Sequence, residues 1–91
     1  MDIESLEYFI AVSKYRNITK TAEVLHISQS ALSRRIQSLE EELGVKLFHR
    51  SNHSIVLTGA GILLKRRAQE LISLAEKTKR EFRMESVLSG E

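Results

Sequence analysis

The stretch that decides the fold is residues 17–37, which read NITKTAEVLHISQSALSRRIQ. Asn17 is a suitable N-cap for a short helix that runs to about Leu25, and Ser28 is suited to begin a second helix after a tight turn. The second helix has an apolar stripe at helical spacing, made up of Leu32, Ile36, Leu39 and Leu43. Two helices joined in this way, over about residues 18–37, are typical of a helix-turn-helix, whose second helix enters the major groove of DNA.

The other face of the second helix carries short polar side chains and an arginine. The outward positions are Gln29, Ser30, Ser33, Arg34 and Gln37, and the first four are the candidate base-contacting residues. Gln can pair with an adenine edge and Arg with a guanine edge, and the amides at the helix start favour a phosphate. Taken singly, each residue is ordinary for a solvated helix face. Their combination behind a helix-turn-helix pattern favours contact with bases.

A small head surrounds the helix-turn-helix. Apolar residues at helical spacing predict a helix over about residues 2–15, and Gly44 is suited to end the second helix of the motif. Apolar runs at residues 45–48 and 55–57 then predict a β-hairpin, or wing. The candidate contacts to the DNA backbone are Lys46, Arg50, Asn52 and His53 on the wing and Arg35 on the preceding helix. A solvated turn remains the alternative for Arg50 and His53.

A long helix is predicted from residue 59 to about residue 86, roughly 40 Å at ~1.5 Å per residue. Its heptad seam consists of Leu64, Ala68, Leu71, Ala75, Thr78 and Phe82. The head alone cannot bury so long a stripe, so we expect the helix to pair with its own copy. The predicted architecture is therefore mainly α: a winged helix-turn-helix with three helices and a small β-hairpin at residues 1–58, then a dimerisation linker helix at residues 59–91 with a frayed C-terminal end.

Composition narrows the class of partner. The net charge of +2 hides two basic blocks, because residues 14–39 carry +4 and residues 46–67 carry +5, with −3 between them at residues 40–45. If both blocks lie on one face of the fold, that face would suit a polyanion. Charges scattered over a solvated surface are the alternative on this observation alone.

Several classes of function lack their sequence signals. Cysteine is absent, which excludes disulfides, thiolate catalysis and zinc sites built on Cys. Motifs for nucleotide binding, a nucleophile elbow or zinc are missing, so we expect no enzyme and no cofactor. His49 and His53 lie four residues apart but in a turn, so we expect no metal site. The chain has no apolar run of about 18 residues and no basic leader, which predicts no membrane contact and a cytoplasmic location.

The chain resembles the N-terminal DNA-binding region of LysR-type transcriptional regulators over roughly residues 3–67. The resemblance is carried by SQSALSRRI at residues 28–36, Leu39-Glu40, Leu43-Gly44, LFHR at residues 47–50 and LTGAG at residues 57–61. It implies a winged helix-turn-helix head and a linker helix that pairs antiparallel with that of a second copy. A separate C-terminal effector-binding domain, which this chain lacks, is implied as well.

The resemblance also implies partners and roles. The partners are double-stranded DNA, with an interrupted palindrome as its site, a second copy of the chain, and RNA polymerase only through the parent protein. Gln29, Ser33 and Arg34 become base-reading or groove-contacting residues, and Arg50 a phosphate contact of the wing. The family usually has Pro where Ser30 stands, so the base preferred at that position is open. A coiled-coil adaptor that binds protein only is the alternative function.

Overall fold

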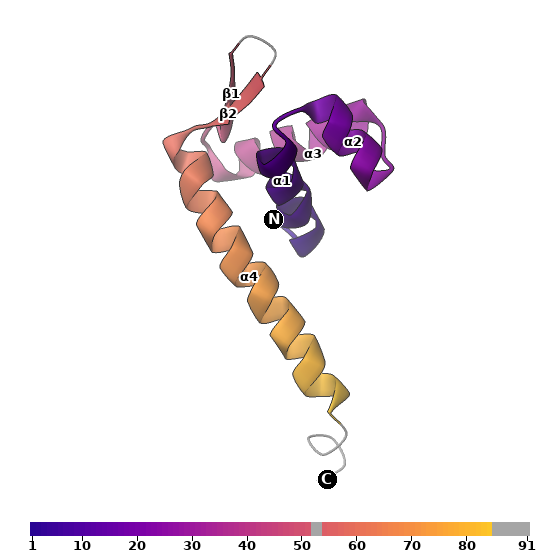
Figure 1. Ribbon diagram of the computed structural model, residues 1–91. Helices are drawn as coiled ribbons and strands as arrows, with labels where there is room; N and C mark the ends of the chain where they lie inside the picture. The colour runs from indigo at the N-terminus through magenta and orange to yellow at the C-terminus, as the bar shows by residue number, and fades with distance from the viewer. Residues whose placement is uncertain (52–53, 85–91) are drawn as a thin grey trace.

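The computed structural model describes residues 1–51 and 54–84. In these residues the chain forms α1 (Ile3–Tyr15), α2 (Ile18–Leu25), α3 (Gln29–Leu43), the strands β1 (Phe48–Ser51) and β2 (Ser54–Leu57), and α4 (Gly59–Arg83). Figure 1 shows α1, α2 and α3 gathered in a head, the hairpin projecting from it, and α4 running away as a long rod. The predicted mainly α winged helix-turn-helix with a long following helix is confirmed.

Each described helix begins at a short polar side chain that accepts a hydrogen bond from a backbone amide three residues on. The pairs are Ser5 N–H to Asp2 (2.8 Å), Lys20 N–H to Asn17 (2.8 Å), Ala31 N–H to Ser28 (3.1 Å) and Gly61 N–H to Thr58 (3.0 Å). Such bonds satisfy amides that have no partner inside the helix. The N-caps predicted at Asn17 and Ser28 are therefore confirmed.

The turns within the head depend on residues in the left-handed conformation. Arg16 (φ 56°), His26 (φ 58°) and Gly44 (φ 71°) end α1, α2 and α3. The Gly44 amide donates to the Glu40 carbonyl at 2.8 Å, which confirms the predicted end of α3. Arg16 and His26 bear a side chain in this conformation, which makes the two other turns tight without a glycine.

The core lies where α1 meets the other helices. Its buried apolar residues are Leu6, Phe9, Val12, Ala22, Leu32, Ile36, Leu39, Leu47, Ile55, Leu64 and Ala68. Phe9 is fully buried, and its ring centroid lies 5.2 Å from that of Phe48 at the base of the wing. α3 and the wing are therefore attached to one common core, which sets their relative positions.

The beginning of α4 belongs to the head, and this corrects the predicted dimer seam. Leu64 and Ala68 are buried, and this part of α4 packs along α1 of the same chain. They are thus not available to a partner helix. Gly61 precedes them in the first turn, where a Cβ would lie only 2.2 Å from the Leu47 carbonyl oxygen. A heptad pattern identifies an apolar stripe but not the element that covers it.

Candidate nucleic-acid interface

α3 buries one face and leaves the other accessible. Leu32, Ile36 and Leu39 are buried against the head, whereas Gln29, Ser30 and Arg34 are exposed and Ser33 is half-buried. The Ser30 hydroxyl lies 3.3 Å from that of the capping residue Ser28. All four candidate base-contacting residues therefore lie on the accessible face of one helix.

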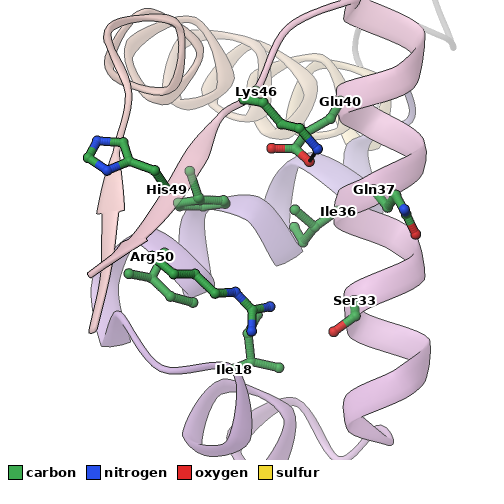
Figure 2. A pocket seen from close by; sticks show the side chains of 10 residues that line it. Ile18, Ser33, Ile36, Gln37, Glu40, Lys46, His49 and Arg50 are labelled. Carbon is green, nitrogen blue, oxygen red and sulfur yellow. Dashed lines mark ion pairs between the residues drawn. The ribbon is translucent and has the colours of Figure 1, made fainter. Parts of the chain in front are cut away.

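A cleft separates α3 from the wing. It has a volume of about 490 Å³, and its polar lining comes from Ser33, Gln37, Glu40, Lys46, His49 and Arg50. In Figure 2, Ser33 and Gln37 lie on the α3 side, and Arg50 reaches from the wing into the space between, near Ile18. The cleft thus brings hydrogen-bond donors of the helix and of the wing to one side of the head.

Hairpin register determines which side chains of the wing point toward α3. Arg50 pairs with the buried Ile55, and His49 pairs with the exposed Val56. Because side chains alternate across a strand, Arg50 shares the inner face with Ile55, and His49 the outer one. Figure 2 accordingly shows His49 pointing away from α3. Asn52 and His53, the other candidates on the wing, lie outside the described residues.

Lys46 lies at the upper end of the cleft beside a carboxylate. Its ammonium is 3.8 Å from Glu40 Oε1, and its side chain is 78% exposed against 13% for Glu40. The other Glu40 oxygen accepts a hydrogen bond from the Leu47 amide at 2.7 Å. Glu40 thus holds the connection between α3 and β1, while so exposed an ammonium can still reach an anion in solvent.

Arg35, an expected contact to the DNA backbone, has its guanidinium directed to α1. Its guanidinium donates to Ser5 Oγ at 3.1 Å, forms an ion pair with Glu4, and lies 3.7 Å from Asp2 Oδ1. It also lies over the Tyr8 ring, 5.1 Å from the centroid. The acidic start of the chain was visible in the sequence, but only the packing of α1 across α3 brings it to Arg35.

One residue that sequence reasoning missed is Thr19. It is exposed in the first turn of α2 and lines a second cleft, of about 440 Å³, together with Gln29, Ser33 and Arg50. The first turn of α2 therefore lies beside the start of α3 and the wing. No local pattern marks Thr19, because its place depends on how α2 crosses α3.

The outer part of α4 presents apolar side chains to solvent. Leu71 is 40% exposed, Leu74 59% and Phe82 62%, and Leu63, which lies nearer the head, is exposed as well. Ala75 is half-buried, and Thr78 is exposed with its hydroxyl donating to the Leu74 carbonyl at 2.8 Å. Leu63 and Leu74 were not among the predicted seam residues. The accessible stripe is rotated from the predicted one because the head covers Leu64 and Ala68.

Other kinds of site find no support in the described part of the chain. Residues 1–51 and 54–84 contain no cluster of three or more His, Cys, Asp or Glu side chains arranged to hold a metal ion. Within the same residues, no helix has both the length and the apolar character that crossing a membrane requires.

Comparison with known proteins identifies relatives of the whole chain. The family model for bacterial regulatory helix-turn-helix proteins of the lysR family matches residues 3–62. The uncharacterized HTH-type transcriptional regulator YcgK of Bacillus subtilis is 41% identical over 86 residues, which are 94% of this chain and 26% of that protein. The chain spans 26% to 39% of the length of the first curated relatives that it matches.

Two solved structures are similar over nearly the whole chain. The CbnR DBD–DNA complex has a TM-score of 0.87 at 38% identity, and the match covers 91% of this chain and 95% of the CbnR chain. The BenM DBD complex with catB site 1 DNA has a TM-score of 0.88 at 36% identity, and the match covers 99% of this chain and 95% of the BenM chain. Both similarities include the long helix as well as the head.

Proposed function

Because the chain belongs to the LysR family of bacterial regulatory helix-turn-helix proteins, we propose that it binds double-stranded DNA sequence-specifically as a dimer. In this proposal α3 enters the major groove, and the wing contacts the sugar-phosphate backbone or the minor groove. The two similar solved structures, which are complexes with DNA, support the extension of DNA binding to this chain.

The observation that carries the proposal is the accessible face of α3. Gln29, Ser30, Ser33 and Arg34 are the proposed base contacts, and they follow one side of a helix whose other side is buried. A helix so mounted can approach base edges without unfolding any part of the head. Gln and Arg can each form paired hydrogen bonds that distinguish one base from another.

The backbone contacts in the proposal come from basic side chains around the cleft. Lys46 and Arg50 are exposed there, and each would neutralise a phosphate. Arg50 is proposed to reach the phosphates next to the bases that α3 reads, because it extends from the wing toward that helix. Arg35 is left out of this set because its charge is engaged by α1.

Dimerisation is proposed to use the exposed stripe of α4. Leu63, Leu71, Leu74, Thr78 and Phe82 lie within one side of the helix at 100° per residue. An apolar stripe on a helix that projects from its head favours a partner helix. Two antiparallel copies of α4 would join two heads whose recognition helices enter major grooves ~34 Å apart, which is the spacing of an interrupted palindrome.

The parent protein is proposed to be a transcriptional regulator of the cytoplasm, not an enzyme. The name of the Bacillus subtilis relative supports this role, and most of that protein's length lies beyond the part that this chain matches. An effector-binding domain and any contact with RNA polymerase would belong to that further part.

Selection of bound sequences from a random pool of double-stranded DNA tests the proposal. We expect two related half-sites in inverted orientation. We also expect the affinity to fall steeply with salt, with a slope of log K against log salt concentration of about −0.9 for each phosphate contacted. Random DNA of the same length is the control. If no sequence is enriched and no saturable binding occurs at low salt, the chain does not bind DNA in this way, and a protein-binding adaptor becomes the better hypothesis.

A further inference from the structure

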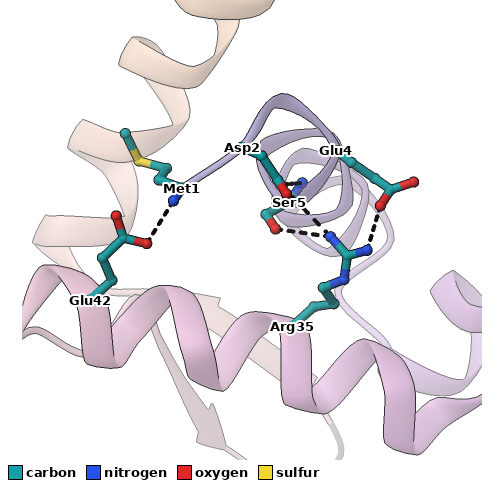
Figure 3. A network of polar contacts seen from close by, with 6 residues as sticks. All are labelled: Met1, Asp2, Glu4, Ser5, Arg35 and Glu42. Carbon is teal, nitrogen blue, oxygen red and sulfur yellow. Dashed lines mark hydrogen bonds and ion pairs between the residues drawn. The ribbon is translucent and has the colours of Figure 1, made fainter.

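The side chains of two adjacent arginines on α3 have different surroundings. Arg34 is exposed, whereas Arg35 is tied to the start of α1 by the three polar residues Asp2, Glu4 and Ser5. Figure 3 shows the guanidinium lying between Glu4 on one side and Ser5 and Asp2 on the other. Its contact with the Tyr8 ring adds a fourth partner on the same helix.

This network is directional, unlike the apolar contacts beneath α3. Leu32, Ile36 and Leu39 bury one face of the helix, but apolar contact depends on area and tolerates small rotations about the helix axis. Hydrogen bonds from a planar guanidinium weaken steeply when the angle changes. Successive residues of a helix point about 100° apart, so the direction held at Arg35 determines the direction of Arg34 and Ser33.

The ionisation of the network agrees with its geometry. Hydrogen bonds from Ser5, together with the charge of Arg35, hold the pKa of Asp2 below its ordinary value. The hydrogen bond to Glu4 raises the pKa of Arg35. The Asp2 carboxylate and the Arg35 guanidinium therefore stay charged around neutral pH, and the guanidinium lies between the carboxylates of Asp2 and Glu4. A guanidinium so balanced releases few counterions when DNA approaches.

We propose that Arg35 is a positioning residue for DNA sequence recognition: with Asp2, Glu4 and Ser5 it sets the rotation of α3 about its axis, and thereby the aim of Arg34 and Ser33. The inference rests on the proposed binding of DNA by α3. It predicts that substitutions in the network change the discrimination between DNA sequences. Folding stability should change little, because exposed ion pairs contribute little to it.

Two substitutions of Arg35 separate positioning from contact with phosphate. Arg35→Gln removes the charge, and Arg35→Lys keeps the charge but removes the planar fork that bonds two partners at once. Positioning predicts that both variants reduce the ratio of affinities for selected and random DNA by about 3- to 10-fold, part of one bidentate base contact. The salt slope should stay unchanged. A salt slope smaller by about 0.9 in Arg35→Gln and wild-type binding in Arg35→Lys would mean a phosphate contact and would overturn the proposal.

Glu4→Gln tests the other side of the network. Removal of a negative charge raises affinity for any DNA, so electrostatics alone leaves the ratio for selected over random DNA unchanged. Positioning predicts that the ratio falls, and that the double variant Glu4→Gln/Arg35→Gln loses no more than either single one. Glu7→Gln is the matched control, because Glu7 is exposed on the same helix and, among the described residues, lies outside the network around Arg35. Equal ratios for Glu4→Gln and Glu7→Gln would count against the network.

A measurement without DNA separates this inference from the proposed function. Residual dipolar couplings of the 91-residue chain report the orientation of α3 relative to α1. We expect α3 to rotate or to gain motion in Arg35→Gln but not in Glu7→Gln. An unchanged α3 would overturn the positioning role even if the chain binds DNA. Failure of the wild-type chain to bind DNA would reject the proposed function and leave the couplings to decide the role of Arg35.

Discussion

At the scale of single residues, neighbours in the sequence have separate tasks because a helix points them in different directions. Arg34 and Arg35 are chemically identical, yet one faces solvent and the other is held by carboxylates of α1. The same distinction occurs on the wing, where the Arg50 side chain reaches toward α3 and the His49 side chain points away from it (Figure 2). Residue type alone therefore does not identify a DNA contact; the direction of each side chain decides it.

Arg34→Ala should relax base preference. If the side chain makes a bidentate contact with a guanine, the loss on the selected site is about 1–3 kcal/mol, and the loss on random DNA is smaller. Fluorescence titration of both DNAs at one salt concentration measures the difference. Equal losses on the two DNAs would show that Arg34 contacts only the backbone.

Arg50→Ala should weaken binding to every sequence by a similar factor and reduce the salt slope by about 1, because one phosphate contact disappears. Arg80→Ala makes the same change of charge near the end of α4 and serves as the control. A repeated selection from random DNA reports base preference. A shift in the selected bases of Arg50→Ala would mean that the wing reads sequence.

Asp2 should make stability depend on pH in acid. Its ordinary pKa is 3.8 and is lowered in the fold, so the unfolded chain binds a proton first as the pH falls. The stabilisation is complete above about pH 5 and disappears as the pH falls through the lowered value. Asparagine at position 2 still caps α1 but cannot titrate. The free energy of unfolding of Asp2→Asn, measured with urea, should therefore fall less steeply than that of the wild type as the pH is lowered. Parallel curves for the two proteins would contradict this role.

At the scale of elements, hydrogen bonds and close packing at the junction between the wing and α4 fix the position of α4 relative to the wing. The Leu47 carbonyl accepts from the Thr58 amide at 3.0 Å, and Thr58 Oγ1 donates to the Lys46 carbonyl at 2.6 Å. Gly61 then lies directly against Leu47. The start of α4 is thus hydrogen-bonded to the strand side of the head, and the wing cannot shift without moving this helix.

Gly61→Ala should destabilise the head by about 1–3 kcal/mol, as overpacking does, because the new Cβ would meet a backbone oxygen that cannot turn away. Gly59→Ala is the matched control, since a Cβ there meets nothing within 4 Å and alanine favours a helix. Chemical denaturation measures both variants. A Gly61→Ala protein as stable as wild type would show that α4 does not pack against Leu47 so closely.

At the scale of the whole molecule, the chain is a small head with a rod. Its extents are 57 × 27 × 19 Å, and the long dimension comes from α4 (Figure 1). The first turns of α4 complete the core of the head, and the remainder presents Leu71, Leu74 and Phe82 to solvent. One end of α4 thus packs against the head. In the proposed dimer, the rest of α4 packs against a second copy of the chain.

Leu71→Glu should dissociate the dimer, because a charge would enter the proposed seam. Gln69→Glu is the control, because it adds the same charge on the opposite side of α4. Sedimentation equilibrium distinguishes monomer from dimer, and the monomer should bind a half-site more weakly than the dimer binds the full palindrome. An intact Leu71→Glu dimer would exclude this stripe as the seam.

The sequence by itself determined the features that depend on neighbours along the chain. Asn17 and Ser28 directly precede their helices and accept a hydrogen bond from an amide three residues on, and Gly44 directly follows α3, so local chemistry was sufficient. The tertiary structure alone decided that α1 holds Arg35 and that the head covers Leu64 and Ala68. The physical reason is that a helical pattern in the sequence indicates which residues share a face of a helix. Which segment covers that face depends on parts of the chain tens of residues apart, which meet only when the core forms.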